Sequence, residues 1–293
     1  MASDLHYWLY NRCVVPLIGD VLPVRWFGPV PPAPASLRPA DQPVNLEIVA
    51  HCWQYAHLLA YQLQAVHRHT PDTVELTYTL YYCESDRLTV GLIDHYDRQG
   101  NPRVRWNWQA LPEAELKRRA IGRNRSALST EADWIWFADC DLIFHDGCLA
   151  SLATALRGLQ ARLVYPASEC ITAMLDATDP VVNVDPVANP EPTVDTGAFA
   201  VSPITKAKGA FQIVHGDVAR HCGYCPGISL YQQPSVHWRK TFEDTAFRQL
   251  IRDQGAAIDV HALHRIRHKA KGRYQPTGWL PKVRQAIRSI KGR

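Results

Sequence analysis

The sequence lacks three features that would place the protein in a familiar class. Its 293 residues contain no run of about 18 apolar residues, the length that a membrane-spanning helix needs. The first residues show no basic region followed by an apolar core, which is the pattern of a secretory signal. No glycine-rich phosphate loop of the Walker or Rossmann type is present. These absences argue against a membrane-spanning or secreted protein, and we expect a cytoplasmic one.

The positions of the cysteines do not suggest a disulfide framework. The eight cysteines are scattered, and several lie inside apolar runs, which suits buried thiols in a reducing compartment. Cys222 and Cys225, with His215 and His221 nearby, are the one grouping that suggests part of a zinc site. Structural zinc takes four ligands and there is no second Cys-x-x-Cys, so zinc is the less favoured interpretation of this stretch.

Acidic residues are missing from residues 260–293, which carry ten Lys or Arg. The other 259 residues hold 22 basic and 28 acidic side chains, so the net charge of +4 hides an acidic body and a basic tail. A basic tail can meet phosphates, nucleic acid or an anionic membrane. Apolar side chains share one helical face of residues 279–290, which predicts a basic amphipathic helix. This helix either docks on the protein or makes peripheral contact with a membrane.

Regular alternation of strand and helix patterns begins at Asn45, and an apolar share of 46% allows a sizeable core. Strands are expected at residues 46–52, 74–82, 103–108, 134–138 and 161–165, and helices at 53–69, 88–96, 112–128 and 146–159. A looser part follows, with a loop at 177–192, strands at 196–201, 209–214 and 258–268, and a helix at 241–254. The alternation predicts an α/β fold with a mostly parallel sheet and helices on both faces.

Residues 1–44 stand apart from this alternation. They combine aromatic and apolar residues with a proline-rich run at 29–43. Proline at that density blocks regular helix and central strand. The pattern predicts an extended arm that packs on the body, with a partly disordered leader as the alternative.

The stretch from Trp134 to Asp141 is the one around which the chain is organised. A short aromatic run ends in Asp139 and Asp141, and buried carboxylates are costly unless they are paired or bind a metal. In an open α/β sheet, ligands bind at the carboxyl ends of the strands. We therefore predict that the two aspartates hold a divalent cation that in turn holds a phosphate. The alternative is an ordinary strand that ends in a polar loop.

Further motifs lie far from this pair but form one ordered pattern with it. They are Arg123-Asn124 before Asp139-Cys140-Asp141, Glu243-Asp244 at the start of a later helix, and His268 after a late strand. In order and spacing, the set resembles the nucleotide-sugar glycosyltransferases of the GT-A fold, closest to family 2. The resemblance covers residues 45–270 and implies one main GT-A domain, flanked by the arm at 1–44 and the tail at 271–293.

The resemblance implies a role for each motif. Asp141 and His268, with Asp139, would bind Mn²⁺ or Mg²⁺, and an imidazole in the set favours Mn²⁺. Asp244, with Glu243 beside it, would take the proton of the acceptor hydroxyl in an inverting transfer. Taken alone, an acidic pair there would merely suit the helix dipole. The donor, expected to be a UDP-sugar, would be held by His51, Glu84, Asp86, Arg123, Asn124 and Asp139.

One departure from the family concerns the loop after the second strand. It reads Cys83-Glu84-Ser85-Asp86, where members often have Asp-x-x-Ser-x-Asp, so the residue that contacts the base stays open. The late histidines His261 and His264 also remain alternatives to His268 as the metal ligand.

Together these features predict a metal-dependent, inverting glycosyltransferase of polysaccharide biosynthesis. Its acceptor would be a hydroxyl of a glycan or of a lipid-linked glycan, in the cytoplasm or at the inner face of a membrane. A nucleotidyltransferase is the rival enzyme, but that class usually has a glycine-rich basic loop where residues 51–54 read His-Cys-Trp-Gln. The non-enzymatic alternative is a nucleic-acid-binding protein that binds nucleic acid through its basic tail. The acidic body and the lack of a binding motif disfavour it, and we do not expect nucleic acid as a partner.

Overall fold

A computed structural model describes residues 2–35, 39, 41–236 and 242–269. Its main sheet has the strand order β10-β6-β9-β4-β1-β2-β3, and a smaller sheet has the order β5-β11-β7-β8. The strands are β1 Val44–His51, β2 Val74–Tyr82, β3 Val104–Ala110, β4 Trp134–Phe137, β5 Leu142–Phe144, β6 Leu163–Pro166, β7 Ser168–Ile171, β8 Ala200–Pro203, β9 Gln212–His215, β10 Ala256–Ile258 and β11 Leu263–Arg265. In the main sheet only β9 runs antiparallel to its neighbours, so the predicted mostly parallel α/β fold is confirmed.

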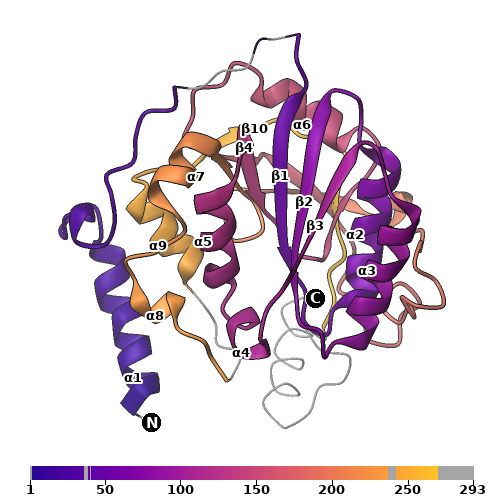
Figure 1. Cartoon of the computed structure of the whole chain (residues 1–293), viewed down its shortest axis with the longest axis horizontal. Coiled ribbons are helices and arrows are strands. Elements are labelled where there is room, and N and C mark those ends of the chain that lie inside the picture. The colour runs from indigo at the N-terminus through magenta and orange to yellow at the C-terminus, as the bar shows by residue number, and fades with distance from the viewer. Residues whose placement is uncertain (1, 36–38, 40, 237–241, 270–293) are drawn as a thin grey trace.

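Helices cover the main sheet on both sides. Figure 1 shows α2 and α3 on one side and α5, α7 and α9 on the other, with α1 beside α8 and α9. The helices are α1 Ala2–Leu9, α2 Ala56–His69, α3 Arg87–Gln99, α4 Glu113–Leu116, α5 Arg119–Ser129, α6 Cys148–Leu156, α7 Gly216–Cys222, α8 Ser229–Gln232 and α9 Glu243–Leu250. No helix of the described ranges combines the length and the apolar character needed to cross a membrane.

Three predicted elements differ from the structure, each at a residue whose backbone leaves the expected conformation. The helix at 112–128 is divided into α4 and α5 at Arg118, whose φ of −114° and ψ of 86° are not helical and whose guanidinium lies over the Tyr7 ring. The strand at 258–268 is two strands in different sheets, separated near Ala262, which has φ 52°. The helix at 241–254 is described from Glu243 and ends at Leu250, shortly before Arg252 at φ 52°. The predicted tail helix lies outside the described residues.

The N-terminal arm differs most from its prediction. From Ala2 to Leu17 the chain is helical, as α1 followed by single π- and 3₁₀-turns, because its first proline is Pro16. Residues 29–35 have no regular secondary structure, as expected of proline-rich chain. The expected packing on the body is present, since Arg162 donates to the Pro32 carbonyl at 2.9 Å.

A close backbone crossing fastens the arm, and it leads to a first prediction. A Cβ added at Gly227 would lie 1.9 Å from the Phe27 carbonyl oxygen, whereas one added at Gly28 would meet nothing within 4 Å. Gly227→Ala should therefore displace the arm and lower the free energy of unfolding by roughly 1–3 kcal/mol. Limited proteolysis should cut the arm of this variant faster. Gly28→Ala is the matched control, and equal proteolysis of both variants would contradict this view of the crossing.

Candidate active site

The site begins where β4 ends. This strand lies between β1 and β9 in the middle of the main sheet, and all four of its side chains are buried. The Trp136 indole donates to the Ala210 carbonyl at 2.9 Å, and the Phe137 ring meets Tyr224 edge-on at 4.8 Å. Anchored in this way, the strand delivers Asp139 to the edge of the core, where about a third of its side chain is exposed.

Two arginines of α5 surround Asp139. Arg119 forms an ion pair with Asp139 Oδ1, and Arg123 Nη2 lies 3.7 Å from the same oxygen. The two arginines are four residues apart and so share one helical face. Asp139 raises the pKa of Arg119 above its ordinary value, and Glu243 adds to this effect. Sequence reasoning selected Arg123 and missed Arg119, although the four-residue spacing was a usable signal.

Arg123 is an internal support rather than an exposed ligand. Only 1% of its side chain is accessible, and it donates to the Tyr224 hydroxyl at 3.0 Å and to the Gly209 carbonyl at 2.8 Å. Its guanidinium also lies over the rings of Phe137 and Tyr224. Asn124 accepts a hydrogen bond from the Tyr224 N–H at 2.8 Å. Both members of the predicted Arg-Asn pair therefore bind Tyr224, whose ring in turn contacts Phe137 of β4.

The second acidic motif reaches the same arginines. Glu243 at the start of α9 is 1% exposed, and within the described part of the chain neither of its carboxylate oxygens has a hydrogen-bond partner. Burial raises the pKa of Glu243, while Arg119 and Arg123 oppose the rise. Asp244 is 28% exposed and lies 3.6 Å from Arg248 Nη1. The fold thus brings the two acidic motifs to one pair of arginines.

His51 at the end of β1 lies beside these arginines. Its ring stacks on Tyr81 at 4.9 Å. Burial lowers the pKa of His51 well below its ordinary value, and Arg123 and Arg119 add to this, so the imidazole is neutral. A Cβ at Gly122 would fall 2.3 Å from His51 Nε2, so only glycine allows α5 to approach so closely.

The two predicted nucleotide contacts of the loop after β2 have different surroundings. Asp86 is buried, caps α3, and accepts hydrogen bonds from the Gln54 N–H at 2.7 Å and the Thr89 hydroxyl at 2.8 Å. Gln54 has φ 53°, an uncommon conformation for a residue other than glycine, so Asp86 shapes the loop after β1. Glu84 is exposed on the surface.

The predicted metal ligands Asp141 and His268 come from adjoining segments. The Asp141 carbonyl accepts from the Ile266 N–H at 3.0 Å, and both predicted ligands are buried. The Tyr55 hydroxyl contacts His268 Nε2, while Gln62 donates to the carbonyls of Asp139 and Leu142 at 2.9 Å each. These contacts support the turn between β4 and β5 from the side of α2.

The donor set suits a cation that arrives with a phosphate. Across the described ranges, no three His, Cys, Asp or Glu side chains are arranged as ligands of one metal ion. Catalytic Mg²⁺ is usually bound by one or two carboxylates together with substrate phosphates, and an imidazole beside a carboxylate suits Mn²⁺. Asp141 and His268 supply a carboxylate and an imidazole, the ligand types that such a cation takes, whereas Asp139 pairs with Arg119.

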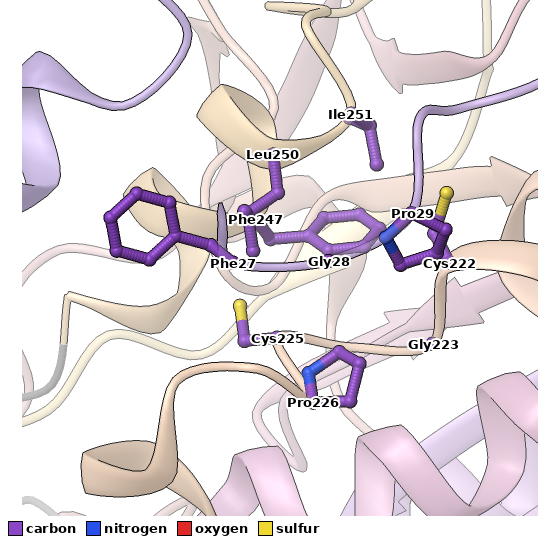
Figure 2. Close-up of a pocket in the computed structure, with 10 residues that line it drawn as sticks. All are labelled: Phe27, Gly28, Pro29, Cys222, Gly223, Cys225, Pro226, Phe247, Leu250 and Ile251. Carbon is purple, nitrogen blue, oxygen red and sulfur yellow. The ribbon is translucent and has the colours of Figure 1, made fainter. Parts of the chain in front are cut away.

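The Cys-x-x-Cys stretch lies elsewhere, at a small apolar cavity between the arm and α9. Figure 2 shows both cysteines on its wall, with Cys222 beside Pro29 and with Phe27 and Phe247 among the other lining residues. Burial raises the pKa of Cys222 to about 11 and also raises that of Cys225. Zinc is bound by thiolates, so neutral thiols in apolar surroundings do not favour the zinc interpretation.

No protein-family model matches the chain, and no curated protein is similar to it. Among solved structures, S. aureus TarS is similar at 12% identity and TM-score 0.46, over 76% of this chain and 60% of TarS. GalNAc-T7 with UDP, GalNAc and Mn²⁺ is similar at 12% identity and TM-score 0.49, over 86% of this chain and 48% of GalNAc-T7. The mannosyltransferase PcManGT of Pyrobaculum calidifontis, in complex with GDP-Man and Mn²⁺, is similar at 14% identity and TM-score 0.45, over 99% of this chain and 72% of PcManGT.

These proteins are GT-A glycosyltransferases. They belong to the class that the sequence resembles. The chain spans less than two thirds of the length of the first two. Since none of these TM-scores reaches 0.5, the activity of the chain is argued from its own residues.

Proposed function

We propose that this protein is a metal-dependent, inverting glycosyltransferase that uses a nucleotide-sugar, expected to be UDP-linked. Its acceptor is the hydroxyl of a glycan or of a lipid-linked glycan. The observation that supports this most is the meeting of the two acidic motifs at one arginine pair. Asp139 contacts Arg119 directly, and the charges of Glu243 and Asp244 act on the same guanidinium.

Arg119 is the residue that we assign to the diphosphate. Over a quarter of its side chain is exposed, and a guanidinium binds phosphate oxygens through paired donors. Asp139 holds it in place before the donor binds and is suited to contact the ribose. The buried Arg123 adds positive charge behind it. We also assign His51, which stacks on Tyr81 and lies against Gly122 of α5, to the nucleotide site.

Asp141 and His268 are the residues that would hold Mn²⁺ or Mg²⁺. Once bound, the cation neutralises the negative charge that develops on the leaving diphosphate. The Tyr55 hydroxyl fixes the orientation of the His268 ring, as outer partners of metal-bound histidines commonly do.

Asp244 is the base that would accept the proton of the acceptor hydroxyl. It is partly exposed, so an acceptor can reach it, and Arg248 Nη1 lies 3.6 Å from its carboxylate. Glu243 is buried behind it, where its carboxylate offsets the charge of Arg119 and Arg123. The two neighbours therefore have separate roles, one towards the acceptor and one towards the arginine pair.

Thermal denaturation with nucleotides tests the proposal. A nucleotide-sugar at about 100 times its Kd should stabilise the protein by about 2.7 kcal/mol, which raises Tm by several degrees. UDP- and GDP-sugars should each be measured with Mn²⁺ and with EDTA, and the shift should be large only with the metal. In Asp141→Asn the metal-dependent part of the shift should disappear. If no nucleotide raised Tm under any of these conditions, the proposed function would be wrong.

A further inference from the structure

Large apolar side chains that face solvent are concentrated on the N-terminal arm. Ten such side chains are exposed within the described part of the chain, and six of them lie between residues 8 and 30. These six, which we term the outer face, are Trp8, Leu9, Leu17, Val21, Trp26 and Val30, with 42% to 68% of each exposed. Single exposed apolar residues are ordinary, but a concentration of them marks a surface that contacts another molecule or a membrane.

The opposite side of the arm is already used for packing. Tyr7, Asn11, Val15 and Ile18 recur every three or four residues and are buried. The Tyr231 hydroxyl donates to Asn11, so the arm is fastened to α8. A helical segment that is apolar on all sides is normally buried, but the described part of the chain leaves Trp8, Leu9 and Leu17 of this segment exposed.

The chemistry of the outer face suits a lipid surface. Trp8 and Trp26 are of the residue type that gathers at the boundary between lipid and water. Arg12 and Arg25 are exposed beside them, and Asp20 is the one exposed acidic residue among residues 6–30. A single apolar insertion binds membranes weakly, and a second, basic element makes the attachment stable.

The sequence supplies that second element and also argues against a second copy as the occupant. Residues 270–293 contain seven Lys or Arg and no acidic residue. An anionic bilayer complements these charges together with Arg12 and Arg25. A two-fold contact between copies would instead press two arms of the same charge pattern together, and neither arm would offer an acidic surface to complement Arg12 and Arg25. We infer that the outer face of the arm docks on an anionic membrane surface.

The docked arm would hold the candidate active site close to the bilayer. The Arg12 guanidinium lies 5.9 Å from the centre of the Phe242 ring, and Phe242 directly precedes Glu243-Asp244. Docking itself does not rest on the proposed transfer reaction. If both hold, the arrangement favours a lipid-linked acceptor over a soluble glycan.

Co-sedimentation of the full chain with vesicles tests the docking. Vesicles of phosphatidylcholine alone and of phosphatidylcholine with about a third phosphatidylserine should be compared, and the wild type should bind the anionic ones. Trp8→Ser with Trp26→Ser should weaken this binding on the order of tenfold, since two interfacial anchors are lost. The matched control is Val187→Ser with Val201→Ser, which removes two exposed apolar side chains outside the arm and should bind like the wild type.

Three results would overturn the inference. The first is failure of the wild type to bind anionic vesicles, and the second is equal binding by the double Trp variant. The third is a dimer in light scattering that the Trp substitutions dissociate, which would assign the outer face to a second copy. Nucleotide-induced stabilisation of the Trp variant should match the wild type. That measurement separates a failure of docking from a failure of the proposed function.

Discussion

Replacing Asp244 by Asn should abolish sugar transfer while leaving donor binding close to the wild-type level. A positioned base contributes about 10²- to 10⁴-fold to a rate, and the amide of Asn cannot accept the proton. Asn has nearly the shape of Asp, so the start of α9 and its contact with Gln212, which donates to the Asp244 carbonyl at 3.0 Å, should persist. We therefore expect kcat to fall by about that factor, with the KM for the donor little changed.

The control for this experiment is the same substitution at an exposed carboxylate. Asp259→Asn changes a side chain that is 79% exposed and should leave kcat unaltered. Donor binding of both variants is measured by nucleotide-induced thermal shift, and turnover by release of the nucleotide. Turnover of Asp244→Asn within a few-fold of the wild type would remove Asp244 from the role of base. Loss of the thermal shift in Asp244→Asn would instead place it in donor binding.

Replacing Arg119 by Ala should have its main effect on the donor. A hydrogen bond to a charged group contributes about 1.5–3 kcal/mol, so losing the contact with the diphosphate should weaken nucleotide binding by roughly 10- to 100-fold. The substitution also leaves Asp139 with the more distant Arg123 as its arginine partner. Arg119→Lys keeps the charge but lacks the paired donors, so its affinity for the nucleotide should lie between those of the wild type and Arg119→Ala.

Arg125 provides the matched control on the same helix. Its side chain is 52% exposed and pairs with Glu115 at 2.6 Å instead of with Asp139. Calorimetric titration with the nucleotide should give Arg125→Ala the wild-type affinity. Unchanged affinity in Arg119→Ala would contradict the assignment of Arg119 to the diphosphate. An equal loss in both variants would show that α5 itself had been disturbed.

The elements of residues 45–166 could be predicted because their signals are local. The alternating and helical patterns of residues 45–166 follow from side chains within one strand or one helix, and the structure has strands and helices there. The division at Arg118 has no local signal, and the partner that Arg118 contacts there, Tyr7, is 111 residues away in sequence. The helical start of the arm lies in the proline-free residues before Pro16, whereas the prediction of an extended arm rests on the prolines of residues 29–43.

The residues of the candidate site divide in the same way. The Asp139-Asp141 pair and Glu243-Asp244 could be picked out by residue type and by their places after a strand and at the start of a helix. Their meeting at Arg119 and Arg123 could not, because it depends on β4, α5 and α9 packing together across about a hundred residues of chain. Likewise, a pattern of residue types does not tell a buried arginine from an exposed one. Burial of Arg123 and Glu243 and the partial exposure of Arg119 and Asp244 are products of tertiary packing, which sets the local environment of each charge.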